Sequence, residues 1–181
     1  MPPAPPAPPA PPVPPAPPVP PAVSFIARAR ASGAQALLGR LPTSPRFDRV
    51  LRGLRVTRVD EAAGEVEAEF EVEEGLQNAY ETLHGGAAAT LVDVVGTMAL
   101  LARDPARAGV SVELSVAYVA AARAGETVRC LGRALKVGRR LGFASVELRR
   151  KGDGELVATG RHTKAYAEER SAPRASAAGQ R

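Results

Sequence analysis

The segment from His84 to about Arg103 constrains the fold most, because its composition predicts one long helix that is apolar nearly all round. A helix with no polar face has to be buried, so the rest of the chain must surround it. Its longest apolar run, residues 91–102, is interrupted by Asp93 and is shorter than the about 20 residues of a membrane span. We therefore expect a core helix and no membrane span.

The residues before this helix alternate between apolar and acidic side chains from Gly64 onward. A period of two predicts a half-buried strand with one solvated face. The glutamates then form that outer face and are not a cluster of catalytic acids. The inward side chains are Val66, Ala68, Phe70 and Val72, and the outward ones are Glu65, Glu67, Glu69, Glu71 and Glu73.

Residues 75–83 have loop composition, and four further strands are predicted after the helix. They cover residues 109–119, 126–137, 141–150 and 155–166, and the turn 151–154 joins the last two. The expected order is strand, buried helix and a four-stranded antiparallel meander. One helix and one sheet have to bury their apolar faces on each other, which predicts an α+β fold with a curved antiparallel sheet around a central helix.

The length of 181 residues suits one domain with tails. Residues 1–22 are a Pro/Ala low-complexity repeat, expected either as a disordered tail or as a ligand for a proline-binding module. Residues 23–44 are basic and match either a targeting segment or an amphipathic helix on the domain, which leaves cytoplasmic, mitochondrial and other organellar locations open. Residues 45–166 form the domain, and 167–181 are expected to be a disordered tail.

Charge and cysteine content exclude several classes of function. The net charge of +5 is spread along the chain, which has no Trp and few other aromatic residues, so we do not expect nucleic-acid binding. An anionic small molecule is the better partner. Cys130 is the only cysteine, so no intrachain disulfide is possible, and a reducing compartment is favoured. No pattern of His and Cys predicts a metal site.

Two features of the predicted helix indicate a candidate catalytic site. Asp93 places a carboxylate in an apolar helix. It is either a satisfied structural residue, a residue on an exposed stripe of the helix, or a general base or nucleophile. At the helix start, His84 is followed by two glycines, which serve either close packing or a ligand near the backbone. Unpaired N–H groups at a helix N-terminus stabilise an oxyanion, as acyl transfer requires.

The spacing of these two features predicts an oligomer. Gly85 and Asp93 are eight residues apart, which is about 12 Å along a helix. One carbonyl group cannot touch both residues of the same chain. If two copies of the helix run antiparallel, Gly85 of one can face Asp93 of the other across a two-fold axis.

The string NAYETLHGG at residues 78–86, followed by TLVD at 90–93, resembles the hotdog-fold acyl-CoA thioesterases of the phenylacetyl-CoA type. The likeness continues through 109–112, Tyr118, 125–126 and 160–164, and FDRVL at 47–51 fits the start of the family. It covers roughly residues 45–166. An Asn followed by His-Gly-Gly and a helical Asp at this spacing is a specific signal.

The resemblance implies a role for each matching residue. The N–H of Gly85 would polarise the thioester carbonyl, and Asp93 of the facing subunit would act as base or nucleophile. Asn78 and His84 would order the loop and the attacking water or leaving group, and Ser111 would orient that water or Asp93. No metal or redox cofactor is implied. The resemblance also implies a homo-oligomer, either a dimer or a homotetramer built as a dimer of dimers, and a fatty acyl substrate, with an aromatic acyl group as the alternative.

By resemblance, CoA is expected along two segments. Cations from both would hold its phosphates, and both are expected away from the helix start. Ala120-Ala121 stands where the family more often has Ser-Pro, which changes the first segment. Two rival functions are another hotdog reaction, hydration or dehydration of an acyl thioester, and non-catalytic acyl-CoA binding. The segments comprise Tyr118, Val119, Ala120, Ala121, Ala122 and Arg123, and Lys136, Val137, Gly138, Arg139, Arg140 and Leu141.

Overall fold

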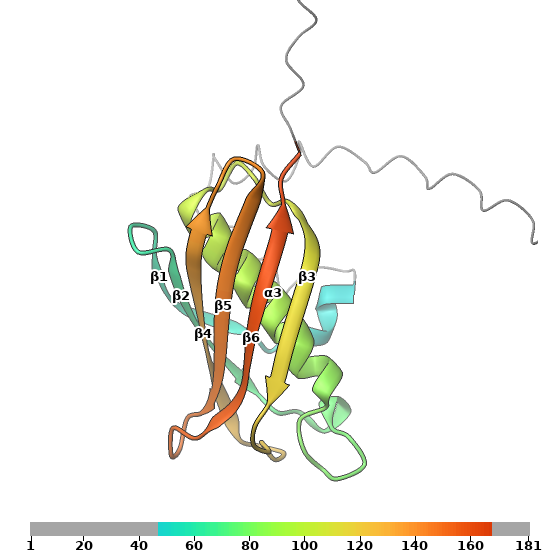
Figure 1. Cartoon of the computed structure of the whole chain (residues 1–181). Coiled ribbons are helices and arrows are strands. Elements are labelled where there is room, and N and C mark those ends of the chain that lie inside the picture. Colours follow the sequence, from blue (N-terminus) through green and yellow to red (C-terminus); the bar gives the residue numbers. More distant parts are fainter. Residues whose placement is uncertain (1–46, 168–181) are drawn as a thin grey trace, which may run out of the picture.

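The computed structural model describes residues 47–167, so the predictions for the N-terminal repeat, the basic segment and the C-terminal tail lie outside the described residues. Figure 1 shows a twisted sheet with one long helix, α3, packed across one face. The elements in chain order are η2 (Phe47–Leu51), β1 (Arg55–Asp60), β2 (Glu65–Glu71), η3 (Glu74–Leu76), α3 (Gly85–Arg103), β3 (Val110–Tyr118), β4 (Thr127–Val137), β5 (Leu141–Arg150) and β6 (Leu156–Ala165).

The helix α3 is the core of the domain, as its composition predicts. Its buried positions cover most of the helix surface and include Leu91, Val92, Val95 and Met98. The exception is a narrow stripe that is exposed or half-buried and includes Gly86, Thr90, Asp93 and Thr97. By length and composition alone α3 would also suffice for a membrane span, but 67% of it is buried inside the domain. Inward side chains of β2, β4, β5 and β6 complete the core, so the predicted α+β arrangement of one sheet around one central helix is confirmed.

The strand order differs from the predicted meander. All pairs are antiparallel, but the order across the sheet is β1-β2-β4-β5-β6-β3. Only β4, β5 and β6 form a meander, because β3 pairs with β6 and leaves β4 to pair with β2. The expectation of four consecutive neighbouring strands was therefore wrong. Its consequence for the site is that β3 lies at one edge of the sheet.

The strand β1 was missed because its alternation is interrupted. The register with β2 shifts between Val56 and Arg58, which leaves Thr57 as an extra residue. The two half-buried valines, Val56 and Val59, are consequently three residues apart instead of two. A bulge of this kind removes the period on which strand recognition depends.

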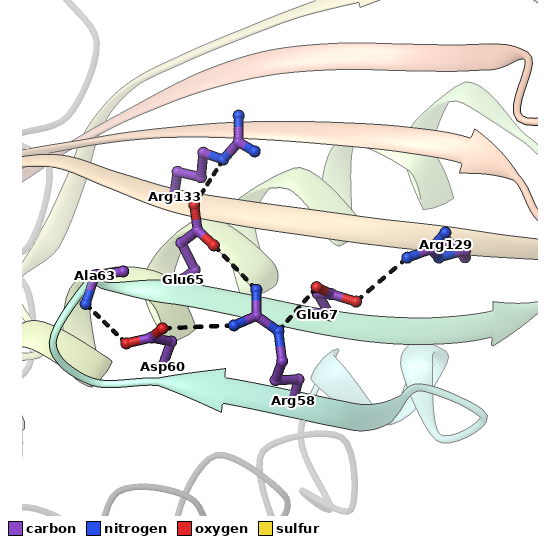
Figure 2. A network of polar contacts seen from close by, with 7 residues as sticks. All are labelled: Arg58, Asp60, Ala63, Glu65, Glu67, Arg129 and Arg133. Carbon is purple, nitrogen blue, oxygen red and sulfur yellow. Dashed lines mark hydrogen bonds and ion pairs between the residues drawn. The ribbon is translucent and has the colours of Figure 1, made fainter.

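The glutamates of β2 form the outer face of the sheet and are paired with arginines on both sides. Figure 2 shows Arg58 of β1 reaching Glu65 (3.0 Å) and Glu67 (2.9 Å). On the other side, Arg133 and Arg129 of β4 contact the same two glutamates at 3.0 and 3.3 Å. The prediction that these carboxylates are a solvated face is confirmed. They hold three strands together and lie on the side opposite α3.

Candidate active site

The start of α3 is capped by His84. The Nδ1 atom of His84 accepts a hydrogen bond from the Gly86 N–H at 2.9 Å. No acceptor for the Gly85 N–H is found among residues 47–167. The ring of Tyr118 covers Gly85, and its hydroxyl donates to the Gly85 carbonyl at 3.2 Å. The Gly85 N–H is therefore a donor available to a carbonyl oxygen at the positive end of a helix.

Asn78 organises the loop before the helix. Its Oδ1 accepts from the Tyr80 N–H (2.9 Å), the Thr82 N–H (3.3 Å) and the Thr82 hydroxyl (3.1 Å). Because Oδ1 is used by the loop, the amide NH₂ is the part of Asn78 that remains available to a ligand. Glu81 adopts a left-handed conformation (φ 58°) to complete this loop. Strain of this kind is common where a loop has to hold functional groups in place.

A pocket of about 340 Å³ joins these groups. It opens between the loop, the start of α3 and the segment after β3. The Leu83 N–H donates to the Ala122 carbonyl (2.7 Å), and Thr82 pairs with Arg123, so the first predicted CoA segment lies against the helix start. The expectation that Arg123 lies away from that point was wrong. The pocket is lined by Asn78, Thr82, Leu83, Gly85, Ala88, Tyr118, Val119, Ala120, Ala121 and Val157.

A second cluster lies farther along α3, where Asp93 meets residues of two strands. Ser111 of β3 donates its hydroxyl to Asp93 Oδ1 at 3.0 Å. The Nε2 atom of His162, on β6, lies 2.8 Å from the Ser111 oxygen and 3.1 Å from Asp93 Oδ1. The Asp93 side chain is 41% exposed, whereas His162 is buried. Ser111 and His162 both contact Asp93 through Oδ1. The other carboxylate oxygen, Oδ2, therefore remains available to a water molecule or a carbonyl carbon.

The surroundings of His162 determine which of its two ring nitrogens carries a proton. Burial lowers the pKa of His162, although the Asp93 carboxylate acts in the opposite direction. The buried Nδ1 has no hydrogen-bond partner among the described residues. An N–H there would be an orphan donor, whereas Nε2–H can donate toward Asp93 and Ser111. We therefore assign the neutral Nε2–H tautomer, in which His162 and Ser111 both direct protons toward the carboxylate.

His162 was not predicted to be part of the site. In β6 the inward positions alternate through Gly160, His162 and Lys164, and both His162 and Lys164 are buried. Two buried polar side chains at positions where a strand expects apolar ones are an unusual pattern. That pattern was the available signal. Lys164 donates its Nζ to Thr97 of α3 at 3.0 Å, one helical turn beyond Asp93.

Within one chain the predicted site residues fall into two separate groups. Gly85, Asn78 and His84 lie at the start of α3, whereas Asp93 and Ser111 lie about 12 Å farther along it. The two predicted CoA segments are also apart. Leu141 and Val110 both pair with Ala165 at one end of the sheet, whereas Tyr118 pairs with Ala158 at the other. Figure 1 shows the β4–β5 turn and the end of β3 at opposite ends.

Comparison with known proteins agrees with this fold. The thioesterase superfamily model matches residues 80–157. Human acyl-coenzyme A thioesterase 13 is 47% identical over 118 residues, which are 65% of this chain and 83% of the human protein. The crystal structure of zebra fish thioesterase superfamily member 2 superposes with a TM-score of 0.68 at 42% identity, covering 74% of this chain and 95% of that one.

A variant of the phenylacetic acid degradation protein PaaI from Thermus thermophilus is more distant. It is 28% identical with a TM-score of 0.57 and covers 66% of this chain and 96% of its own. The fold and the relatives together define a hotdog-fold thioester hydrolase. The chain belongs to the thioesterase superfamily, in the branch that contains the acyl-CoA thioesterases.

Proposed function

We propose that this thioesterase hydrolyses a fatty acyl-CoA to the free fatty acid and CoA, in a site built by two copies of the chain. The observation that supports the proposal is the separation of the two groups along α3. Gly85 and Asn78 present donors for a thioester oxygen, and Asp93 presents an acceptor for a water proton. One chain holds both halves but too far apart for a single thioester.

The exposed edge of the sheet is where the second copy would bind. β3 is an edge strand whose exposed side chains include Val110 (65%), Val112 (55%) and Leu114 (40%). An apolar edge with unpaired backbone groups is a template for another strand. A copy related by a two-fold axis would pair its own β3 antiparallel to this one.

The same pairing would bring the separated groups together. The Val110 end of one β3 would lie beside the Tyr118 end of the other. Asp93 and Ser111 of one copy would then approach Gly85 of the second copy. The turn with Arg139 and Arg140 would likewise approach the segment that ends at Arg123. One acyl-CoA could lie along both segments, with its thioester between the two helices.

The reaction follows from the atoms that remain available. Asp93 Oδ2 accepts a proton from water, and the hydroxide attacks the thioester carbon. The Gly85 N–H and the Asn78 amide stabilise the oxyanion. Collapse of the tetrahedral intermediate breaks the C–S bond, and the CoA thiolate takes the proton. The alternative is direct attack by Oδ2, which gives a mixed anhydride that water then hydrolyses.

A panel of acyl-CoA substrates with detection of free thiol tests the proposal. We expect thiol release to be fastest with a fatty acyl chain, and faster with it than with phenylacetyl-CoA. Fastest turnover of the aromatic substrate would overturn the fatty acyl assignment, and failure to release thiol from any acyl-CoA would overturn hydrolysis itself.

A single turnover in ¹⁸O water separates the two routes. The general-base route puts ¹⁸O into the fatty acid in the first turnover. In the nucleophilic route, water that attacks the Asp93 carbonyl of the mixed anhydride leaves the label in the enzyme, and the first product keeps an Asp93 oxygen. Label in Asp93 therefore identifies the nucleophilic route with this direction of hydrolysis.

A further inference from the structure

The turn between β4 and β5 is held from inside the domain by one arginine. Arg107 lies in the connection between α3 and β3. Its Nη1 donates to the carbonyl oxygens of Gly138 (3.1 Å) and Arg139 (2.9 Å). Its Nε donates to Asp104 at 2.6 Å, and Asp104 is the residue that caps the C-terminus of α3. The guanidinium therefore ties the end of the core helix to the turn.

An aromatic ring supports this guanidinium. The Tyr166 ring centroid lies 4.4 Å from the guanidinium carbon of Arg107, within the range of a cation–π contact. The Tyr166 N–H donates to the Arg140 carbonyl at 2.8 Å. The ring is buried over Gly142, where a Cβ atom would lie 2.1 Å from the Tyr166 hydroxyl oxygen. That hydroxyl has no partner among the described residues, so the ring itself provides the contact.

The result is a turn with two different sides. Three consecutive carbonyls, those of residues 138, 139 and 140, accept bonds from Arg107 and Tyr166. Carbonyl oxygens carry partial negative charge and would repel a phosphate. Here they face the body of the domain, while the side chains of Arg139 and Arg140 are exposed. The turn is thus ordered in a shape that presents cations on its outer surface.

We propose that Arg107, stacked on Tyr166, is a positioning residue that holds the β4–β5 turn, residues 138–140, in the shape in which Arg139 and Arg140 bind the phosphates of CoA. This inference rests on the proposed function, because it takes CoA to be the ligand of the turn. Arg107 acts through the turn and does not touch the substrate. Ordering the turn in advance lowers the entropy cost of fixing two long side chains on a phosphate.

The first test is the turn itself. Replacing Arg139 and Arg140 together by Ala should raise KM for an acyl-CoA about tenfold with little change in kcat, as loss of uniform binding predicts. The effect should shrink at high salt, because exposed charges are screened. An unchanged KM would show that the turn does not hold CoA, and would overturn the inference even if the wild-type enzyme hydrolyses acyl-CoA.

The second test concerns Arg107 and the Tyr166 ring on which it stacks. Arg107→Met keeps the aliphatic stem and should raise KM for an acyl-CoA about tenfold, with kcat within about twofold. Arg107→Lys should not rescue binding, since an ammonium cannot reproduce the planar fork of donors. Tyr166→Phe keeps the ring and should resemble wild type, whereas Tyr166→Leu should resemble Arg107→Met.

A truncated substrate separates positioning from general damage. The acyl thioester of N-acetylcysteamine lacks the nucleotide, so its KM should not change in Arg107→Met. The matched control is Arg149→Met, because Arg149 also binds a carboxylate, Glu147 (2.9 Å), and a turn carbonyl, Gly154 (3.0 Å), at the other end of β5. We expect it to leave both substrates unaffected. An equal rise in KM for both substrates in Arg107→Met, or a loss confined to kcat, would overturn the inference.

Calorimetric binding of CoA alone keeps this inference separate from hydrolysis. Weaker CoA binding by Arg107→Met than by Arg149→Met supports the positioning role of Arg107, whether or not the wild-type enzyme releases thiol. Equal CoA affinity of these two variants contradicts it.

Discussion

At the scale of single residues, Asp93 is held by two donors and yet remains open to solvent. Ser111 and His162 both approach Oδ1, and the side chain is 41% exposed. Because the side chain is partly exposed, Oδ2 is open to a water molecule. The arrangement fixes the direction of Oδ2, which is what a general base or nucleophile requires.

The variant Asp93→Asn should keep the fold and lose most hydrolysis. Asparagine has the same shape and retains an oxygen for the Ser111 hydroxyl, but it cannot take a proton from water. We expect kcat to fall about 10²- to 10⁴-fold, with an unchanged melting temperature. Glu147→Gln, on the outer face of β5, is the control carboxylate and should be fully active. Retention of more than about half of the wild-type turnover would exclude Asp93 as the acid/base.

Gly96 provides space for His162 in the middle of α3. A Cβ atom at Gly96 would lie 3.0 Å from Nδ1 and 3.2 Å from Cβ of His162. Glycine inside a helix costs about 1 kcal/mol relative to alanine. This destabilising glycine lies where the His162 ring packs against the helix.

The variant Gly96→Ala should therefore separate stability from activity. We expect a melting temperature equal to or above that of wild type, and a kcat about 3- to 30-fold lower because the His162 ring has to shift. Gly152→Ala is the control, because a Cβ atom there meets nothing within 4 Å. Unchanged kcat in Gly96→Ala would mean that the position of His162 does not matter for turnover.

At the scale of elements, ion pairs link neighbouring strands on the outer face of the sheet, whereas the inner face is held by apolar packing. Glu67 of β2 contacts Arg58 of β1 at 2.9 Å and Arg129 of β4 at 3.3 Å. The hydrogen bond from Arg58, together with its charge, lowers the pKa of Glu67, although partial burial acts against this. These pairs link β1, the shortest and bulged strand, to the rest of the sheet.

This lowered pKa predicts acid sensitivity with a definite sign. The unfolded chain titrates Glu67 near pH 4.5 and the folded chain at lower pH. The unfolded state therefore binds more protons in between, and the contribution of Glu67 to stability is complete above about pH 4.5 and lost as pH falls through the folded pKa. Glu67→Gln lacks this contribution at every pH, so it should be less stable than wild type at pH 7, lose less stability between pH 7 and pH 2, and have a midpoint of acid unfolding that is higher by about 0.2–0.5 pH unit.

The comparison for Glu67→Gln is Glu61→Gln. Glu61 is exposed between β1 and β2 and forms no ion pair among residues 47–167. Circular dichroism from pH 7 to pH 2 measures both variants. An identical acid profile for wild type and Glu67→Gln would show that the pairing with Arg58 and Arg129 does not contribute to stability.

At the scale of the whole molecule, the single chain holds the two halves of the proposed site apart and has an exposed sheet edge. The proposed oxyanion donors and Asp93 are about 12 Å apart along one helix. The two basic segments of the chain lie at opposite ends of the sheet. A two-fold axis beside β3 would remove both separations at once and would cover the apolar edge.

Mixing two inactive variants should restore activity if the site is shared. Consider Gly85→Val, which fills the helix start, and Asp93→Asn. A mixed dimer would contain one site with both changes and one site with neither. After unfolding and refolding together in equal amounts, about a quarter of wild-type activity is expected, because half of the dimers are mixed and each has one intact site.

Each variant refolded alone is the control for this mixture and should stay inactive. No recovery in the mixture, or a fully active monomer by solution scattering, would contradict a shared site.

Patterns of short range were readable from the sequence. The period of two in residues 64–73 placed the glutamates of β2 on the outer face, and the apolar composition of 84–103 placed α3 in the core. The cap at His84 and the rise per residue between Gly85 and Asp93 depend only on local helix geometry. These features follow from backbone periodicity, which acts between neighbours in the chain.

Only the tertiary structure decided the rest, because it depends on pairing between distant segments. The position of β3 beside β6 determines which edge is exposed, and no local pattern distinguishes it from a place in a meander. His162 meets Asp93 and Ser111 from three elements separated by up to 69 residues of chain, from position 93 to position 162. In the sequence, Arg107 is one of several charged residues in a connecting segment. Only the fold shows that it contacts the β4–β5 turn. Local periodicity specifies which face a residue occupies, but contact between faces depends on how the whole chain closes around α3.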